Sequence, residues 1–321
     1  MSEAQEGIQG VDVTTAGHLF TPKDTFALTE ELNKGKNPDD WAQIEVYPTP
    51  EYKPLTFMRA LSKRFGLELP IPPGVTEEQI RSWQREYPHT KVARVHLPFS
   101  YNRYELFQRA TPLIGGEREN GLRQTAYQIL WMVYFGAATN MKGVKLAQGL
   151  ADQGVGINAH ANVIEGFAKD QNLGQLKDSV AFVLAENERR YKSPILKDSE
   201  SIANPIAVIR NIVDKYDLDG LVFGVDHGFE QGMDPTAMLQ EPSIKRSTVA
   251  MHLAQSHHDV LAVGNNEFER FLEQAARTKF DHPVRAALDY NPMVMSKLSG
   301  SQQLELVRDT IEWITGTQKK V

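Results

Sequence analysis

The chain has 321 residues, and its 35 basic and 41 acidic side chains give a net charge of −6 with histidine neutral. A dedicated nucleic-acid binder carries concentrated positive charge, so a nucleic-acid partner is not expected here. The sequence contains no cysteine, which excludes disulfides, iron–sulfur clusters, zinc ribbons and thiol nucleophiles. Histidine and carboxylate side chains would have to hold any metal ion.

The N-terminal residues are acidic and polar, without the basic and apolar pattern of a signal peptide. No stretch approaches 18 consecutive apolar residues, so no membrane span is expected. We therefore expect a cytoplasmic protein. Residues 1–9 are expected to form a disordered tail.

Eight short apolar segments alternate with longer segments that have helical spacing. The apolar segments are predicted as strands over residues 10–20, 41–47, 91–99, 155–163, 180–187, 221–226, 248–253 and 284–289. Helices are predicted over residues 24–33, 55–65, 121–138, 204–216, 266–279 and 302–314, with a short polar helix over 76–87. Asp24 is expected to cap the first of these helices.

Strands that alternate with helices indicate a parallel sheet, and eight such units indicate a (β/α)8 TIM barrel with outer helices. A doubly wound sheet with a small extra domain is the alternative. We expect residues 1–321 to form a single barrel domain. Prolines break residues 67–90, which are expected to be an insertion within it.

Polar side chains that can bind a metal stand at or next to the ends of the last five predicted strands. They are His160, Glu186, Asp226 with His227, His252 and Asp289. Strand ends converge on one face of a barrel, where charged groups are costly unless they are paired or bound to a cation. A divalent ion such as Zn, Mn, Co or Mg would satisfy several of them together.

Asp226 and His227 are adjacent, so on a strand their side chains would point to opposite faces. Only one of them would then reach the ion, unless the strand has already ended. Residues that would bind a substrate at the same face are His96, His257, Glu45, Asn187 and Glu230. Two of the candidate residues also have an interpretation without a functional role. His252 would fit an apolar strand as a core histidine with its hydrogen bonds satisfied, and His257 lies in a polar loop.

The stretch from His227 to Asp234, HGFEQGMD, resembles the segment His-Ala-Phe, two residues, Gly, one residue, Asp of the endonuclease IV family. Glu186 with Asn187 is similar to that family's fifth-strand Glu-Asn, and His252 lies in an MHL segment similar to its seventh-strand His-Leu. By strand pattern over about residues 11–314, the chain resembles the xylose isomerase-like TIM barrel superfamily, which includes sugar isomerases, epimerases and endonuclease IV. The resemblance implies metal ligands at Glu186, His227 and His252, a substituted ligand at Asp289 and a fourth-strand ligand at His160.

The sequence departs from this pattern in two places. The acid that the endonuclease family has three residues before His227 is Gly224 here, with Asp226 as its replacement candidate. No Asp-x-His pair follows His252, which speaks against a three-metal cluster. The smaller ligand set of the isomerases and epimerases would be met by Glu186, Asp226, His252 and Asp289, the last one methylene shorter than the usual Glu.

The leading hypothesis is a metal-dependent sugar or sugar-phosphate isomerase or epimerase that works at the C-terminal mouth of the barrel. The ion would polarise a substrate carbonyl, and Glu186 or Asp289 would move the proton. The alternatives are an endonuclease IV-like phosphodiesterase and a barrel that binds a small molecule or a partner without catalysis. The sequence leaves the substrate, the metal and the oligomeric state open.

Overall fold

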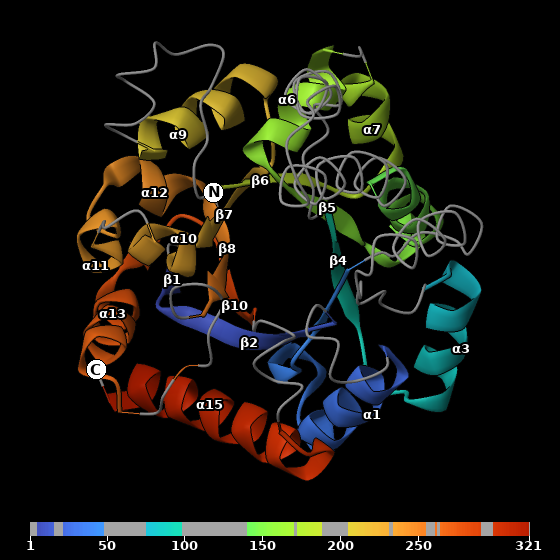
Figure 1. Cartoon of the computed structure of the whole chain (residues 1–321), viewed down its shortest axis with the longest axis vertical. Helices are drawn as coiled ribbons and strands as arrows, with labels where there is room; N and C mark the ends of the chain where they lie inside the picture. Colours follow the sequence, from blue (N-terminus) through green and yellow to red (C-terminus); the bar gives the residue numbers. More distant parts are fainter. Residues whose placement is uncertain are drawn as a thin grey trace, which may run out of the picture.

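A closed barrel of parallel strands forms the centre of the protein, and helices surround it (Figure 1). In this computed structural model the described residues are 5–15, 22–47, 75–97, 140–169, 172–187, 205–230, 234–254, 261, 264–289 and 298–320. Around the barrel the strands follow the order β10-β2-β3-β4-β5-β6-β7-β8, and β10 pairs with β2 to close it. The predicted (β/α)8 barrel is therefore confirmed, and the doubly wound alternative is wrong.

All the predicted strands are present in the barrel, with bounds that differ at the ends. They are β2 (Ile8–Thr14), β3 (Ile44–Val46), β4 (Val92–Leu97), β5 (Gly156–His160), β6 (Val183–Glu186), β7 (Gly220–Gly224), β8 (Thr248–Leu253) and β10 (Val284–Leu288). Parallel strands are buried on both faces, which is why most of them read as continuous apolar runs in the sequence.

The helices of the described residues lie mainly outside the barrel (Figure 1). They are α1 (Pro22–Asn33), α3 (Glu77–Glu86), α6 (Ala161–Lys169), α7 (Leu173–Ser179), α9 (Pro205–Tyr216), α10 (Val225–Glu230), α11 (Pro235–Met238), α12 (Pro242–Ser247), α13 (Asn266–Arg277) and α15 (Gly300–Lys320), with a further helical stretch over 140–149. The helices predicted over 55–65 and 121–138 fall outside the described residues. Within those residues, no helix is both long and apolar enough to cross a membrane.

Helix α13 shows how sequence sets the position of an outer helix. Asn265 caps its N-terminus, where the side-chain oxygen accepts hydrogen bonds from the backbone N–H groups of Glu267 and Phe268. Helical spacing then places one apolar face against the barrel, and that face is buried at Phe268, Phe271, Leu272 and Ala275.

The structure adds detail at the N-terminal end. Within the range expected as a tail, β1 (Gln5–Glu6) pairs antiparallel with β9 (Lys279–Phe280), and β2 begins at Ile8. Asp24 lies in the first turn of α1 and does not cap it, because the helix already begins at Pro22, a residue favoured at that position.

The structure describes residues 75–90 of the range expected as an insertion. Its described part carries α3, which lies between β3 and β4 in the chain. Trp83 of α3 packs on Phe26 of α1, with ring centroids 5.4 Å apart. Residues 75–90 therefore supply one of the helices that surround the barrel.

The barrel wall has an outer face and an inner face, because successive side chains on a strand point to opposite sides. Leu184, Val222 and Ala250 form a small apolar cluster of their own, separate from the main core between the barrel and its helices. At other alternate positions the buried side chains are polar or charged: Asp12, Glu45, Arg94, His96, Asn158, Glu186 and His252. Much of the inner face is therefore polar, and these groups must satisfy one another.

The main core predicts a clear difference between two neighbouring residues of α13. Phe271 is fully buried against Phe223 of β7, with ring centroids 6.5 Å apart, whereas Arg270 is exposed. We expect Phe271→Ala to lower the free energy of unfolding by about 3–5 kcal/mol, since it leaves a cavity. Arg270→Ala, the matched control, should change it by less than about 0.5 kcal/mol. Urea denaturation measures both, and equal losses would contradict this packing.

Candidate active site

Glu186, at the C-terminal end of β6, contacts three histidines that come from different elements. Its Oε2 lies 2.8 Å from His96 Nε2 on β4, and its Oε1 lies 2.7 Å from His252 Nδ1 on β8. His227 Nε2, on α10, lies 3.8 Å from the same Oε1. The Glu186 side chain is only 1% exposed, so this carboxylate depends on the imidazoles for compensation of its charge.

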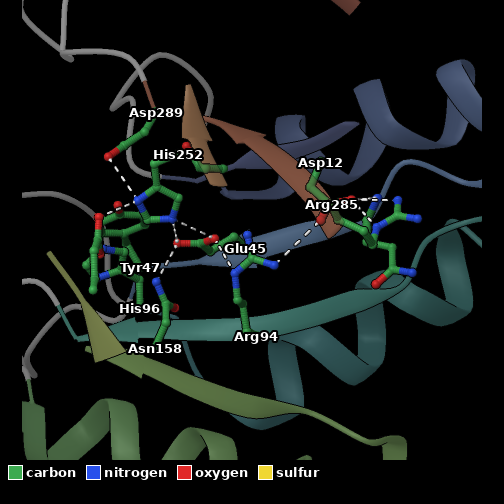
Figure 2. Close-up of polar contacts among 12 residues, drawn as sticks. Asp12, Glu45, Tyr47, Arg94, His96, Asn158, His252, Arg285 and Asp289 are labelled. Atoms are coloured by element: carbon green, nitrogen blue, oxygen red, sulfur yellow. Dashed lines mark hydrogen bonds and ion pairs between the residues drawn. The ribbon is translucent and has the colours of Figure 1, made fainter. Parts of the chain in front are cut away.

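His252 stands between carboxylates on both edges of its ring, as Figure 2 shows. Nδ1 faces Glu186 and, at 3.8 Å, Oδ2 of Asp289, while Nε2 lies 3.0 Å from Oε1 of Glu45. Burial alone would lower the pKa of His252, but Glu186 and Glu45 outweigh it and hold the pKa well above its usual value. Burial would raise the pKa of Glu186, but His252 and His96 outweigh it and hold that pKa well below its usual value.

His160, the last residue of β5, has the opposite electrostatic setting. Burial lowers its pKa to about 3 and outweighs the attraction of Glu186, so the ring is neutral at physiological pH. His160 Nδ1 and His96 Nδ1 are buried and make no hydrogen bond within the part of the chain that the structure describes. The neutral ring of His160 is therefore available as a metal ligand.

The donors fit a divalent ion. His96, His160 and Glu186 each offer one ligand atom, and those atoms lie within 4.8 Å of one another. Glu45, His96 and His252 form a second such group. Imidazole nitrogens with carboxylate oxygens suit Zn or Co better than Mg, which prefers an all-oxygen shell.

The position of Asp226 and His227 is set by where β7 ends. The strand stops at Gly224 and α10 begins at Val225, so alternation along a strand no longer separates the two side chains. His227 Nε2 faces Glu186, and Asp226 Oδ2 lies 3.4 Å from His227 Nδ1. His227 is therefore the nearer of the two to the centre of the site, and Asp226 contacts its other ring nitrogen.

There is no room at Gly224 for the acid that the endonuclease IV family has three residues before the histidine that corresponds to His227. A Cβ atom there would lie 2.7 Å from Cδ2 of His227 and 3.3 Å from Oε1 of Glu186. Asn187, expected to bind substrate, instead uses its side-chain amide on the backbone of Gly224: Nδ2 donates to the carbonyl oxygen at 2.8 Å, and Oδ1 accepts from the N–H at 2.6 Å. The ring of His227 thus occupies the space of a side chain at 224.

The remaining predicted site residues are Asp289, Glu230 and His257. Asp289 directly follows β10 and is buried, and its backbone N–H donates to the carbonyl of Leu253. Glu230 ends α10, but its side chain lies outside the described part of the structure, as does all of His257.

Tyr47 belongs to the site but was missed in the sequence. Its ring stacks on His96, with centroids 4.3 Å apart and planes 24° apart. Burial raises the pKa of Tyr47 well above its usual value, and the negative charges of Asp289, Glu45 and Glu186 add to this, so the phenol stays protonated. The available signal was alternation, because Tyr47 lies two residues after Glu45 and hence on the same face of its strand.

The same signal would have identified polar residues deeper in the barrel. Arg94 lies two residues before His96, and Asn158 lies two residues before His160. All four are on the inner face, and the side-chain amide of Asn158 donates to Oε1 of Glu45 at 3.3 Å.

Comparison with known proteins gives the fold class. No protein-family model matches the sequence, and no curated protein matches it either. Among the solved structures with the same fold is 3-keto-D-glucoside 4-epimerase from E. coli in its apo form, with 11% identity, a TM-score of 0.52 and coverage of 96% of this chain and 99% of that one. Another is D-allulose 3-epimerase from Methylomonas sp. in complex with D-allulose, with 13% identity, a TM-score of 0.51 and coverage of 98% of both chains. The comparison therefore shows a shared (β/α)8 barrel fold.

The environment of Glu45 predicts a pH-dependent contribution to stability. Burial would raise the pKa of Glu45, but Arg94 and His252 outweigh it and lower the pKa from 4.5 to about 2. That difference corresponds to about 3 kcal/mol of native-state stability, present above pH 4.5 and lost as the pH falls towards 2. We expect Glu45→Gln to be less stable than the wild type by about that amount at pH 7 and by about half of it at pH 3.

Urea denaturation of both proteins at a series of pH values measures this difference. Glu78→Gln, at an exposed carboxylate on α3, is the matched control and should show a difference near zero at every pH. A Glu45→Gln loss that stays constant from pH 7 to pH 3 would show that the charge of Glu45 does not stabilise the native state.

Proposed function

We propose that this chain is a metal-dependent sugar isomerase or epimerase of the xylose isomerase-like superfamily, active at the C-terminal mouth of the barrel. The observation that carries the proposal is the buried contact of one carboxylate, Glu186, with His96, His252 and His227 at the ends of the strands. The fold shared with two sugar epimerases over nearly the whole chain supports it. The C-terminal face is also where barrels of this kind place their chemistry.

The ion would be held by Glu186 together with neighbouring imidazoles. His96 and His160 complete one donor group with Glu186, His252 and His227 contact Glu186 as well, and Asp289 lies 3.8 Å from His252. When bound there, a divalent ion supplies Lewis-acid polarisation of a substrate carbonyl. The histidine-rich donor set makes Zn or Co the preferred ions, with Mn next.

Asp289 is the side chain that we assign to proton transfer. Isomerisation and epimerisation beside a carbonyl both need a base that removes a proton from carbon and returns it. Glu186 is closely held by imidazoles, and its lowered pKa makes it a weak base, which suits a ligand. The Asp289 side chain is 9% exposed against 1% for Glu186 and lies nearer to an entering substrate. Tyr47, hydrogen-bonded to Asp289 and protonated, would donate to a substrate oxygen.

The substrate proposed is a small sugar or sugar phosphate. The endonuclease-like alternative is less well supported, because the chain has a net charge of −6 and the two structures described above are sugar epimerases. A barrel that binds a small molecule without catalysis is a defined outcome of the experiments that follow.

Metal analysis tests the centre of the proposal. After loading with Zn or Co and removal of free ion, we expect about one ion per chain in the wild type and far less in Glu186→Gln, which loses the charged ligand. Glu77→Gln, at a carboxylate that pairs with Arg81 on α3, is the matched control and should bind as the wild type does. About three ions per chain would favour the phosphodiesterase, and no stoichiometric ion would favour the non-catalytic barrel.

Proton transfer is tested by deuterium uptake from D2O into ketoses, aldoses and their phosphates, followed by NMR. We expect uptake at the carbon next to the carbonyl of at least one sugar. Asp289→Asn should reduce its rate by about 10²–10⁴-fold, the usual contribution of a general base, while the ion is still bound. Thr248→Val, at the far end of β8 from the mouth, should leave the rate unchanged. An Asp289→Asn variant as fast as the wild type would remove Asp289 from this role.

A further inference from the structure

A continuous line of charged side chains crosses the barrel interior below His252 (Figure 2). It links five strands, β8, β3, β4, β2 and β10, in that order. The contacts are His252 Nε2 to Glu45 Oε1 at 3.0 Å, Glu45 Oε2 to Arg94 Nε at 2.6 Å, Arg94 Nη1 to Asp12 Oδ2 at 3.6 Å, and Asp12 Oδ1 to Arg285 Nη2 at 2.7 Å.

Glu45 is poorly suited to binding substrate, although its place near the end of β3 suggested that role. The residue is fully buried. One carboxylate oxygen faces His252 and the amide of Asn158, and the other faces Arg94. Both oxygens are thus engaged by protein groups, and a sugar at the mouth would meet His252 before it met Glu45.

The contact with Glu45 lies at Nε2 of His252, on the opposite edge of the ring from Glu186. A carboxylate at Nε2 accepts a hydrogen bond from that nitrogen and so holds a proton on it. Nδ1 is then the atom that faces Glu186 and Asp289. A carboxylate behind a metal-facing histidine fixes the tautomer and the ring orientation and raises the basicity of the ligand.

Packing alone does not require these charges inside the barrel. Elsewhere on the inner face, the apolar side chains Leu184, Val222 and Ala250 fill the same kind of space. Replacing a buried ion pair by apolar residues of similar volume is often neutral or stabilising in proteins. The line of charged side chains therefore needs an explanation other than filling the barrel. The contact of Glu45 with His252, at one end of the line, suggests that explanation.

We propose that Glu45 is a positioning residue that holds the Nε2 proton and the orientation of the His252 ring, and that Arg94 and Asp12 hold Glu45 in place for this purpose. The inference rests on the proposed function, because the ion and the sugar are what His252 would be positioned for. It extends that function to residues of β2, β3 and β4, below the mouth.

Two variants and a control test the proposal. Glu45→Gln removes the charge and keeps the shape. The double variant Glu45→Met with Arg94→Met removes both partners, so that no buried guanidinium is left without its carboxylate, and it serves if the single variant does not fold. Thr248→Val is the control: it changes a buried hydroxyl at the start of the strand that carries His252, where Thr248 bonds only the backbone of Ile244 among the described residues.

Zn affinity, measured by competition with a chromophoric chelator, is the first readout. We expect Glu45→Gln and the double variant to bind Zn about 10–100-fold more weakly than the wild type, the usual loss when a partner of a metal-bound histidine is removed. The control should bind as the wild type does. Wild-type affinity in a folded variant with lowered stability would show a purely structural role and overturn the proposal.

The NMR signals of the His252 ring in the ion-free protein are the second readout, and they are independent of the proposed function. We expect an Nε2 proton that exchanges slowly in the wild type and the control, and its loss in the double variant. If the wild type binds no Zn but shows this difference, the metal-dependent function fails and the positioning role stands. If the ring signals are the same in all the proteins, the positioning role fails whatever the metal result.

Discussion

Compensation of buried charge inside the barrel is the constraint on which the rest of the structure depends. Glu45 and Glu186 are almost fully removed from water, and an isolated carboxylate in that position would be very costly. His252 lies between them and contributes positive charge to both, and Arg94 compensates Glu45 from the other side. Each of these two acids is compensated by bases from other strands: Glu186 on β6 by His96 of β4 and His252 of β8, and Glu45 on β3 by Arg94 of β4 and His252.

The same constraint divides the barrel interior into two kinds of surface. Around β6 to β8 the deeper inner positions are apolar, with Leu184, Val222 and Ala250 packed together. On β2, β3 and β4 the interior is ionic and built around Arg94. His252 lies at the junction, with the apolar cluster below it on its own strand and the carboxylates around its ring. The chemistry at the mouth thus rests on an ionic half of the barrel as well as on the strand ends.

The sequence predicted the barrel because parallel strands buried on both faces leave apolar runs, and it predicted the strand-end positions of Glu186, His252 and Asp289. The pairing of Glu45 with Arg94 could not be predicted from the sequence, because it depends on the register between β3 and β4, which no local pattern encodes. The relation of Asp226 to His227 depended on the residue at which β7 ends. The two hydrogen bonds between the Asn187 side chain and the backbone of Gly224 are apparent only in the structure.

The seam where β2 meets β10 joins parts of the chain that lie far apart in the sequence. Asp12 and Arg285, which bridge that seam, are 273 residues apart in sequence. Contacts of such long range form late, because the entropy of closing the loop must be overcome before they contribute. A nascent chain that lacks β10 would expose the ionic interior to water and leave Asp12 without its guanidinium partner on β10. The protein therefore completes its candidate site only when the barrel closes, so partly folded chains would lack the assembled chemistry.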